Sequence, residues 1–478
     1  MRSPDSIRAA VLLALAASVS ACSFAPRLEI PVVPTAATYK EQAPWTQATP
    51  ADRLPRDAWW SLYDDAELNR LQQQLIANSP DLEAALARYE QAKAYSDQLR
   101  SGLFPSLFLN GEGRRARQSE TNPPGGGASP RYYNAYALGA EASYEVDLWG
   151  RVRNSVSAGR FTAEAAAADL ESARLSLQAQ LADYYIALCG LDRQDALLND
   201  TVTAYDRALS LTGERHEAGI AAGLDVARAQ TQLDTAKSQA AQNLAQRAIV
   251  EHAIASLIGV SPSQFSLPPR AVNLKLPEIP GDVPANLLQR RPDIAAAQRR
   301  TASANASVGV AKAAYFPSIT LNGTYGFQST QSSDWLSAPN AAWSIGPSLL
   351  LELFDSGRRK AQVAQAQAAL NESGATYRGV VLTAFQQVED NLALLHYYGM
   401  AAESERSAVK SAQRSLDFAM NRYREGAVSY LEVVQSQTTS LTAQREALDL
   451  ETRQLRASVA LIRSLGGGWS AEPLTAAR

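Results

Sequence analysis

The chain has 478 residues, a net charge of −3 and a pI near 5.8, so no excess of positive charge favours binding to nucleic acid. Beyond the first 21 residues the sequence has no run of about 18 apolar residues, which excludes a transmembrane helix from that part. If this part of the chain crosses a membrane, it must do so as strands of a closed barrel.

The N-terminus has the pattern of a bacterial lipoprotein signal. Two arginines flank the start of a short apolar stretch, residues 9–17, and small residues stand directly before Cys22. This ending resembles the site where a lipoprotein signal is cut and the cysteine is lipidated; an ordinary signal peptide with an incidental cysteine is the alternative. We predict a signal peptide over residues 1–21 and lipid attachment at Cys22. Ser23 after the cysteine is compatible with the outer membrane.

A proline-rich arm, residues 22–60, precedes the first helix, and four segments farther on alternate between apolar and polar residues. The first two span residues 107–114 and 136–147, and the other two span residues 319–328 and 343–353. Their lengths are close to the roughly 9–11 residues that a tilted membrane strand needs. One face is polar or small, whereas the other is apolar with aromatic side chains at its ends, as in strands that face lipid. The alternative is a half-buried hairpin of a soluble protein, which alternates in the same way.

The loops between the paired segments, residues 115–133 and 329–342, are long and polar, which is typical of the outer-surface loops of a membrane barrel. Pro347 argues against the fourth strand, because proline removes a hydrogen-bond donor from the ladder. Four strands are too few to close a barrel, since the smallest filled barrels need about eight. Several copies of the chain must then contribute, and three copies would supply about twelve strands.

Each pair of strands precedes two long helical stretches, which we predict at residues 150–215 and 225–258 in the first half and at residues 357–424 and 431–465 in the second. The first is rich in alanine and free of proline, which favours a helix that would reach roughly 100 Å if unbroken. The last carries a heptad-like seam for coiled-coil packing at Leu431, Val434, Thr438, Leu441, Arg445, Leu448, Thr452, Leu455, Val459 and Ile462. An ordinary cytosolic coiled coil would explain this seam but not the strands or the lipoprotein signal.

The two halves of the chain are copies of one unit. Phe104–Leu107 recurs as Phe316–Ile319 at an offset of 212 residues, and Gly219 recurs as Gly426 at an offset of 207. The offset changes only where the first copy carries a longer loop, so one duplicated unit is the economical interpretation. We therefore divide the chain into a signal peptide (1–21), an arm (22–60), a first repeat (61–260), a proline-rich linker (261–284), a second repeat (285–468) and a tail (469–478).

Short motifs recur along nearly the whole chain in the order of a known family. They are Trp59-Trp60, Phe104-Pro105-Ser106-Leu107, Tyr144–Arg151, Arg290-Arg291-Pro292-Asp293-Ile294, Ala384–Asp390 and Leu465–Trp469. Together they resemble the TolC-like outer membrane factor family, and specifically its lipoprotein branch, the outer membrane components of resistance-nodulation-division (RND) efflux systems. Each motif is weak by itself, whereas the ordered set is specific.

The resemblance implies an α+β fold with an internal two-fold repeat. A homotrimeric transmembrane β-barrel, with four strands from each chain, would continue as a long helical tunnel through the periplasm. The protein would be lipid-anchored in the outer membrane, with a periplasmic membrane-fusion adaptor and an inner-membrane RND-type pump as partners. It would conduct small molecules, such as drugs and toxic organics, passively to the exterior. Alternatives are a channel for type I protein secretion or metal-ion efflux and, more distantly, a structural envelope lipoprotein.

The resemblance also assigns a channel constriction to the periplasmic tip of the second repeat. In the family, acidic side chains of the return helix point inward there and ring the closed end of the tunnel. Glu432 stands at one such position, whereas Gln435 replaces an aspartate common at the other, which lowers the expected charge of the ring. The two are three residues apart and share one helix face. We expect Leu431 and Val434 to pack against the neighbouring helix.

The sequence carries no motif of an enzyme. His216, His252 and His396 are scattered, and none stands at metal-ligand spacing from another. The chain has no nucleophile elbow, phosphate loop or dinucleotide fingerprint. Cys189 lies among apolar residues, which indicates a structural thiol rather than a reactive one. We therefore expect no catalytic residues, no cofactor and no metal site.

Overall fold

The computed structural model describes residues 23–30, 58–117, 132–277 and 291–467. The predicted signal peptide, Cys22, most of the proline-rich arm, part of the linker and the whole tail lie outside the described residues. The predictions on those segments therefore stay predictions.

The chain folds as two compact units, each assembled from separate stretches of sequence. Of the described residues, the strand unit comprises 23–30, 89–117, 132–166 and 296–378, and the helix unit comprises 58–88, 167–277, 291–295 and 379–467. Each unit draws on both halves of the sequence, so matching parts of the two copies fold together.

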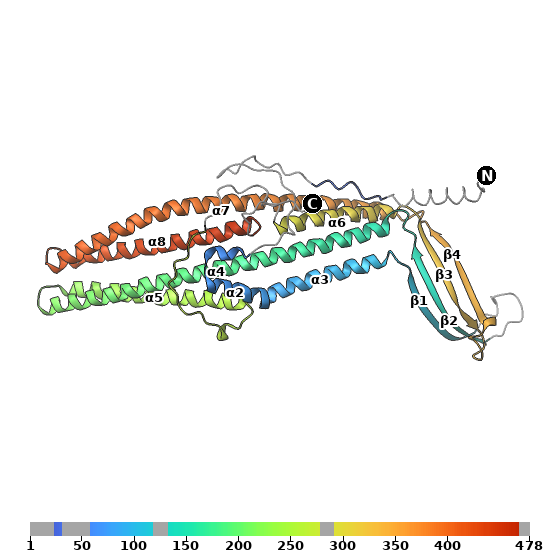
Figure 1. The fold of residues 1–478 in the computed structure, drawn as a ribbon, viewed down its shortest axis with the longest axis horizontal. Helices are drawn as coiled ribbons and strands as arrows, with labels where there is room; N and C mark the ends of the chain where they lie inside the picture. The colour runs from blue at the N-terminus through green and yellow to red at the C-terminus, as the bar shows by residue number, and fades with distance from the viewer. Residues whose placement is uncertain (1–22, 31–57, 118–131, 278–290, 468–478) are drawn as a thin grey trace. The chain divides into compact units, whose positions relative to one another are not determined.

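The strand unit contains a four-stranded antiparallel sheet in the order β1-β2-β3-β4 (Figure 1). Its strands span Ser106–Arg117, Tyr132–Glu145, Ser318–Ser329 and Ala341–Leu350. All four predicted strands are present, but the fourth ends earlier than predicted, so Leu351 and Leu353 lie beyond it. Pro347 lies within β4, opposite Leu321 of β3. Because β4 is an edge of the described sheet, the missing proline donor can point away from β3.

The register places the apolar rows of all four strands on one face of the sheet. Leu109 lies opposite Ala140, Ala140 lies opposite Tyr325, and Tyr325 lies opposite Trp343. This face is uncovered in the single chain, where Leu109 is 76% and Trp343 is 73% exposed. Contiguous exposed apolar surface of this kind marks a contact with lipid or another protein.

An acidic side chain caps the long helix that follows each hairpin. Asp147 accepts a hydrogen bond from the backbone N–H of Arg153 at 2.8 Å, and Asp355 accepts one from the backbone N–H of Arg359 at 3.1 Å. Both carboxylates also pair with the guanidinium of the same arginine. An acidic side chain at a helix N-terminus satisfies free N–H groups and the helix dipole. The prediction that the second strand includes Asp147 is therefore wrong; β2 ends at Glu145, and Asp147 caps the helix.

The predicted long helices are confirmed, with ends within two residues of the predicted ones. They are α4 (Arg151–Glu217), α5 (Gly223–Leu257), α7 (Arg358–Arg424) and α8 (Tyr430–Ser464). The copies agree in length, since α4 and α7 have 67 residues each and α5 and α8 have 35 each. Shorter helices are α2 (Ala66–Asn78), α3 (Pro80–Ser101) and α6 (Pro292–Ala313). Within the described ranges, no helix combines the length and apolar character needed to span a bilayer.

The core of the helix unit forms around α2 and the 3₁₀-helix η1 (Trp59–Tyr63), which pack with residues of α4, α5 and α8. Leu68, Leu71 and Leu75 of α2 are fully buried there. The Tyr63 hydroxyl forms a 2.6 Å hydrogen bond with the Ser458 hydroxyl of α8. Cys189 is buried in the same core, and burial raises the pKa of its thiol to about 12. The thiol stays protonated at physiological pH, which confirms the predicted structural role.

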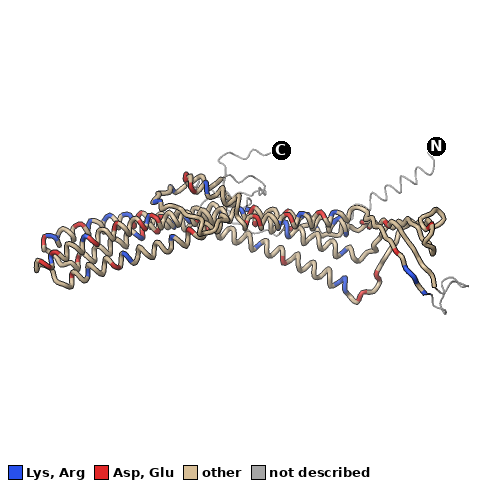
Figure 2. Tube along the Cα trace, turned by 90° about the horizontal axis from the view of Figure 1, so that it is seen from below, with Lys and Arg blue, Asp and Glu red and all other residues tan. Residues whose placement is uncertain are grey.

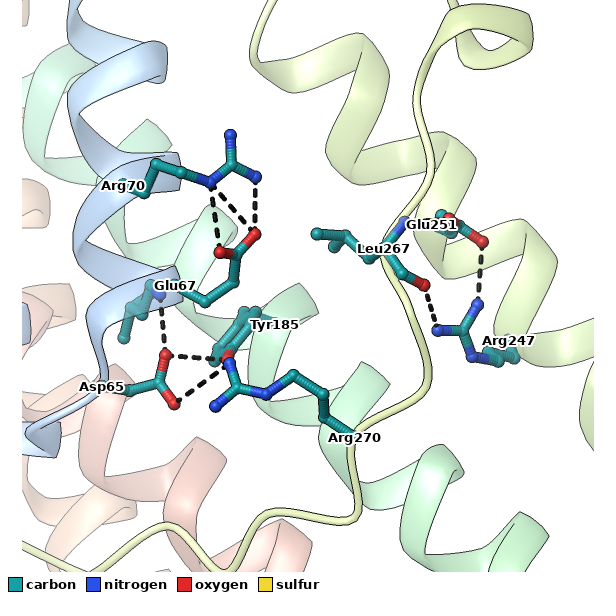
Figure 3. A network of polar contacts seen from close by, with 9 residues as sticks. Asp65, Glu67, Arg70, Tyr185, Arg247, Glu251, Leu267 and Arg270 are labelled. Atoms are coloured by element: carbon teal, nitrogen blue, oxygen red, sulfur yellow. Dashed lines mark hydrogen bonds and ion pairs between the residues drawn. The ribbon is translucent and has the colours of Figure 1, made fainter.

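A buried polar network binds residues 258–277, which we call the strap, to the helices. Arg247 of α5 donates to Asp192 of α4 at 2.6 Å and to the backbone oxygen of Leu267 in the strap at 2.7 Å. It also pairs with Glu251 at 2.9 Å (Figure 3). The backbone N–H of Arg270 completes the set by donating to Asp192 at 2.8 Å. The buried guanidinium of Arg247 thus has two carboxylates and a backbone oxygen as partners. A charge is kept inside a protein only when it is paired and hydrogen-bonded in this way.

A second part of the network fixes the start of α2. Asp65 accepts a hydrogen bond from the backbone N–H of Leu68 at 2.9 Å and so caps the helix. The Tyr185 hydroxyl of α4 donates to the same carboxylate at 2.8 Å. Arg270 of the strap approaches Asp65 to 4.0 Å, and Figure 3 shows both side chains pointing toward it. One carboxylate thus ties α2, α4 and the strap together.

Within the single chain, the first half of α8 buries a different row of residues from the predicted seam. The residues buried within the chain are Tyr430, Val433, Gln437 and Ser440, each one position before a predicted one. From Leu455 onward the prediction and the structure agree. In the first half of α8, some of the residues buried within the chain are small or polar, as Gln437 and Ser440 are. A heptad pattern chosen for apolar residues therefore selects the neighbouring face of the helix. Leu431, expected to pack against a neighbouring helix, is 41% exposed, and Val434 is only half-buried.

Candidate functional site at the helical tip

The candidate site is the pair of turns that joins α4 to α5 and α7 to α8, in the helix unit. We call residues 215–230 and 422–437 the helical tip. Two residues after the end of each long helix stands a glycine in the left-handed region, Gly219 after α4 and Gly426 after α7, both with φ of 76°. A residue with a Cβ adopts this conformation only with strain, which explains why glycine occupies the turn in both copies.

Arg215 of α4 links the two turns. Its guanidinium donates a 2.9 Å hydrogen bond to the backbone oxygen of Arg424 and lies 5.0 Å from the centre of the Tyr423 ring. Tyr423 meets Tyr430 edge to face at 5.2 Å. Both tyrosines are at most 4% exposed and pack in one cluster with Ala229 of α5. The two helical hairpins are therefore joined at their ends by this tip cluster.

The tip cluster relies on uncharged aromatic rings and one cation. Burial, with Tyr423 close by, raises the pKa of Tyr430 to about 12, so the phenol stays neutral at physiological pH. Cation–π contacts, aromatic pairs and single hydrogen bonds each contribute about 0.5–1.5 kcal/mol. Contacts of this size hold the ends of the two hairpins together.

The two residues predicted for the constriction lie beside this cluster rather than in it. Glu432 and Gln435 are both exposed on the first turns of α8. Glu432 forms an ion pair with Arg422 of α7 at 3.6 Å, and the two side chains are 47% and 56% exposed. A pair this exposed contributes at most about 1 kcal/mol to stability. The side chains of Glu432 and Gln435 are therefore accessible to solvent or to another chain.

Sequence reasoning missed Arg215, Tyr423 and Tyr430, although the repeat carried a signal for the first. Arg215 and Arg422 occupy the same position in the two copies, at the offset of 207 residues. Asp225, paired with Arg228 at 3.4 Å, likewise corresponds to Glu432. An arginine before each turn and an acid after it form a duplicated pattern that residue-by-residue comparison of the copies would have found.

The residues next to the predicted lipidation site are held in the strand unit. The Ser23 hydroxyl donates to the side-chain oxygen of Asn154, near the start of α4, at 3.0 Å. The ring of Phe24 stacks on Phe316, just before β3, with 4.5 Å between centres. The segment that follows Cys22 is thus fixed where strands meet helices.

No cluster of three or more histidine, cysteine or acidic side chains suited to a metal ion occurs in the part of the chain that the structure describes. The arrangement instead offers a sheet with an uncovered apolar face and two helical hairpins joined at a tip. An uncovered apolar sheet face of this kind is typical of proteins that a membrane anchors through strands.

Comparison with known proteins identifies the family. The chain belongs to the outer membrane efflux protein family, whose model matches twice, over residues 71–260 and 283–467. It is 32% identical to the outer membrane protein OprJ of Pseudomonas aeruginosa, over 98% of this chain and 97% of that protein. It is 29% identical to the toluene efflux pump outer membrane protein TtgC of Pseudomonas putida, over 96% of each chain.

Solved structures agree. The outer-membrane channel OprN superimposes with a TM-score of 0.86 at 30% identity, over 94% of this chain and 100% of that one. The open state of the Neisseria gonorrhoeae channel MtrE superimposes with a TM-score of 0.81 at 26% identity, over 94% and 98%. The predicted family, fold class, outer membrane location and role as an outer membrane efflux channel are confirmed. The family is one of transport conduits.

Proposed function

We propose that the chain is the outer membrane channel of a tripartite efflux pump and passively conducts small molecules, such as drugs and toxic organics, to the exterior. It would receive them from an inner-membrane RND-type pump through a periplasmic adaptor, without a catalytic step or a cofactor. The observation that carries the proposal is the family match over both copies. Relatives named for the export of toluene and of pyoverdine support small-molecule cargo.

We propose a homotrimer as the working unit. In the described sheet, β1 and β4 are edge strands whose outer backbone groups have no partner strand in the chain. In lipid, each unsatisfied backbone group costs several kcal/mol, so the edges must pair with other copies. Three chains would close a barrel of about twelve strands, which is wide enough for a lumen.

The purified protein is expected to have the mass of a trimer in mild detergent and to form ion-conducting pores in planar lipid bilayers. Its expression should also restore drug resistance to a strain that lacks its own outer membrane efflux channel. Heat-denatured protein of the same preparation is the control for the bilayer measurement. A folded monomer, or a trimer without conductance, would contradict the proposal and favour a structural lipoprotein.

We propose Cys22 as the lipidated first residue of the mature protein. The lipoprotein-like signal supports this, as does the attachment of Ser23 and Phe24 where strands meet helices. Mass spectrometry of the mature N-terminus should find an acylated Cys22. Cys22→Ser should impair processing of the signal more than membrane residence, since the strands also hold the protein in the membrane. An unmodified N-terminus at another position would show the assignment to be wrong.

We propose that Glu432 and Gln435 line a constriction at the helical tip. Their exposure on α8 supports this, because side chains that line a lumen cannot be buried within their own chain. Replacing both by alanine is expected to raise single-channel conductance and weaken cation selectivity, with a stability change of at most about 1 kcal/mol. Glu67→Ala, which removes a carboxylate from an exposed pair on α2, is the control. Conductance and reversal potential equal to those of the parent would refute the assignment.

A further inference from the structure

Two arginines end the apolar row of β1. Alternate residues of this strand put Leu107 and Leu109, then two glycines, and then Arg115 and Arg117 on the same face of the sheet. Figure 2 shows basic residues gathered toward the far end of one strand of the sheet. Arg114 belongs to the opposite face and lies 3.5 Å from Glu112, which is also on that face.

The spacing along β1 puts the two arginines at the level of lipid headgroups. Arg117 lies ten residues beyond Leu107, about 34 Å along the strand and, at a tilt of about 40°, about 26 Å along the membrane normal. The apolar band of a membrane barrel is about 25 Å tall. Because the other end of the strands continues into the periplasmic helices, this end faces the outer leaflet.

Arg115 and Arg117 lie beside an aromatic ring at the end of β1 and are exposed. Arg117 lies opposite Tyr132 of β2, with its guanidinium 5.8 Å from the centre of the ring. Arg115 lies opposite Asn134, two residues from Arg117 on the same face, so their Cα atoms are about 6.8 Å apart. Both arginines are exposed. Among the described residues, the side chain of Arg115 has no hydrogen-bond or ion-pair partner.

We propose that Arg115 and Arg117, flanked by Tyr132, bind the phosphate of a phosphorylated glycolipid in the outer leaflet. A guanidinium presents a planar fork of donors that matches phosphate oxygens, and two such side chains on one face, with Cα atoms about 7 Å apart, can share one phosphorylated headgroup. The apolar row below them accommodates the acyl chains of the same lipid, which free phosphate does not have. The tyrosine ring occupies the interfacial level that aromatic side chains prefer.

The test uses the full-length trimer in detergent, titrated with diphosphoryl lipid A and followed by native mass spectrometry. Arg115→Gln with Arg117→Gln is expected to weaken binding about 30-fold, from roughly 1 kcal/mol per arginine at an anionic surface. Arg114→Gln, on the opposite face, should leave binding unchanged. Dephosphorylated lipid should bind the parent as weakly as diphosphoryl lipid A binds the double variant.

The proposal would be overturned if the double variant bound the lipid as tightly as the parent does. It would also be overturned if Arg114→Gln weakened lipid binding as much as the double variant does. Displacement of the lipid by millimolar inorganic phosphate would show a site for free phosphate and would also overturn it. If the double variant does not assemble, the single variants carry the test, with about fivefold weaker binding expected for each. Single-channel conductance should not change in any of these variants, because the two side chains lie outside the proposed lumen. The inference rests on the proposed channel, whose own failure would be seen as a lack of conductance in the parent protein.

Discussion

Replacing Gly259 by alanine is expected to destabilise the helix unit by about 3–5 kcal/mol, because strain and collision act together at this position. Gly259 follows α5 with a φ of 74°. A Cβ there would lie 2.2 Å from the backbone oxygen of Asn78, the last residue of α2, and 3.3 Å from Pro80, the first residue of α3. That oxygen belongs to the main chain, so it can retreat only if the two helices move. Thermal unfolding in detergent, followed by circular dichroism, measures the loss.

Gly219→Ala is the matched control. Gly219 has nearly the same φ, 76°, but its Cβ would meet nothing within 4 Å. The free energy of unfolding of this variant should therefore fall only by the cost of the left-handed conformation, about 1 kcal/mol. Equal losses in the two variants would show that the close approach to Asn78 does not contribute.

Arg247→Met is expected to cost about 3–5 kcal/mol, because it removes one partner from a buried ion pair and leaves the others charged. Its side chain is 10% exposed and that of Asp192 is 3% exposed, so water cannot replace the lost partner. The strap also loses its hydrogen bond at Leu267. Hydrogen exchange should therefore speed up at the backbone amides of residues 258–277, in addition to the loss seen in thermal unfolding.

The control for this variant is Arg456→Met, which breaks a second well-formed pair, with Asp183 at 2.7 Å. Its side chains are 46% and 29% exposed, so solvent screens the charges and the expected loss is at most about 1 kcal/mol. If Arg247→Met cost no more than Arg456→Met, burial would not be the origin of the effect. Unchanged exchange in the strap would refute its attachment through Arg247.

Sequence reasoning succeeded where the structure follows from local signals. The alternation of the four strands, the alanine-rich helices and the recurring glycines depend on residues close together in the chain. It failed at the ends of strands, where Asp147 caps the following helix instead of extending the strand. An acidic residue that continues the polar alternation of a strand can equally be the cap of the next helix. The two cannot be distinguished until the start of that helix is known.

The helical tip shows a second limit of sequence reasoning. Glu432 and Gln435 were predicted through the family resemblance, whereas Arg215 and Tyr423 were not predicted at all. Their contact joins residues of different hairpins, so no spacing along the chain reveals it. The network around Asp192 and the strap was missed for the same reason, because its partners come from three separate segments.

The two sequence repeats meet in the middle of the sheet, where β2 pairs with β3, and this affects biogenesis. Ser143 of β2 lies opposite Asn322 of β3, 179 residues farther along the chain. At a synthesis rate of about 5–20 residues per second, the first hairpin waits on the order of ten to thirty seconds for its partner. Until then the β2 edge that pairs with β3 is unpaired, and an unpaired strand edge invites aggregation. We therefore expect a holding chaperone to be needed most during export of the first half, before any second copy of the protein takes part.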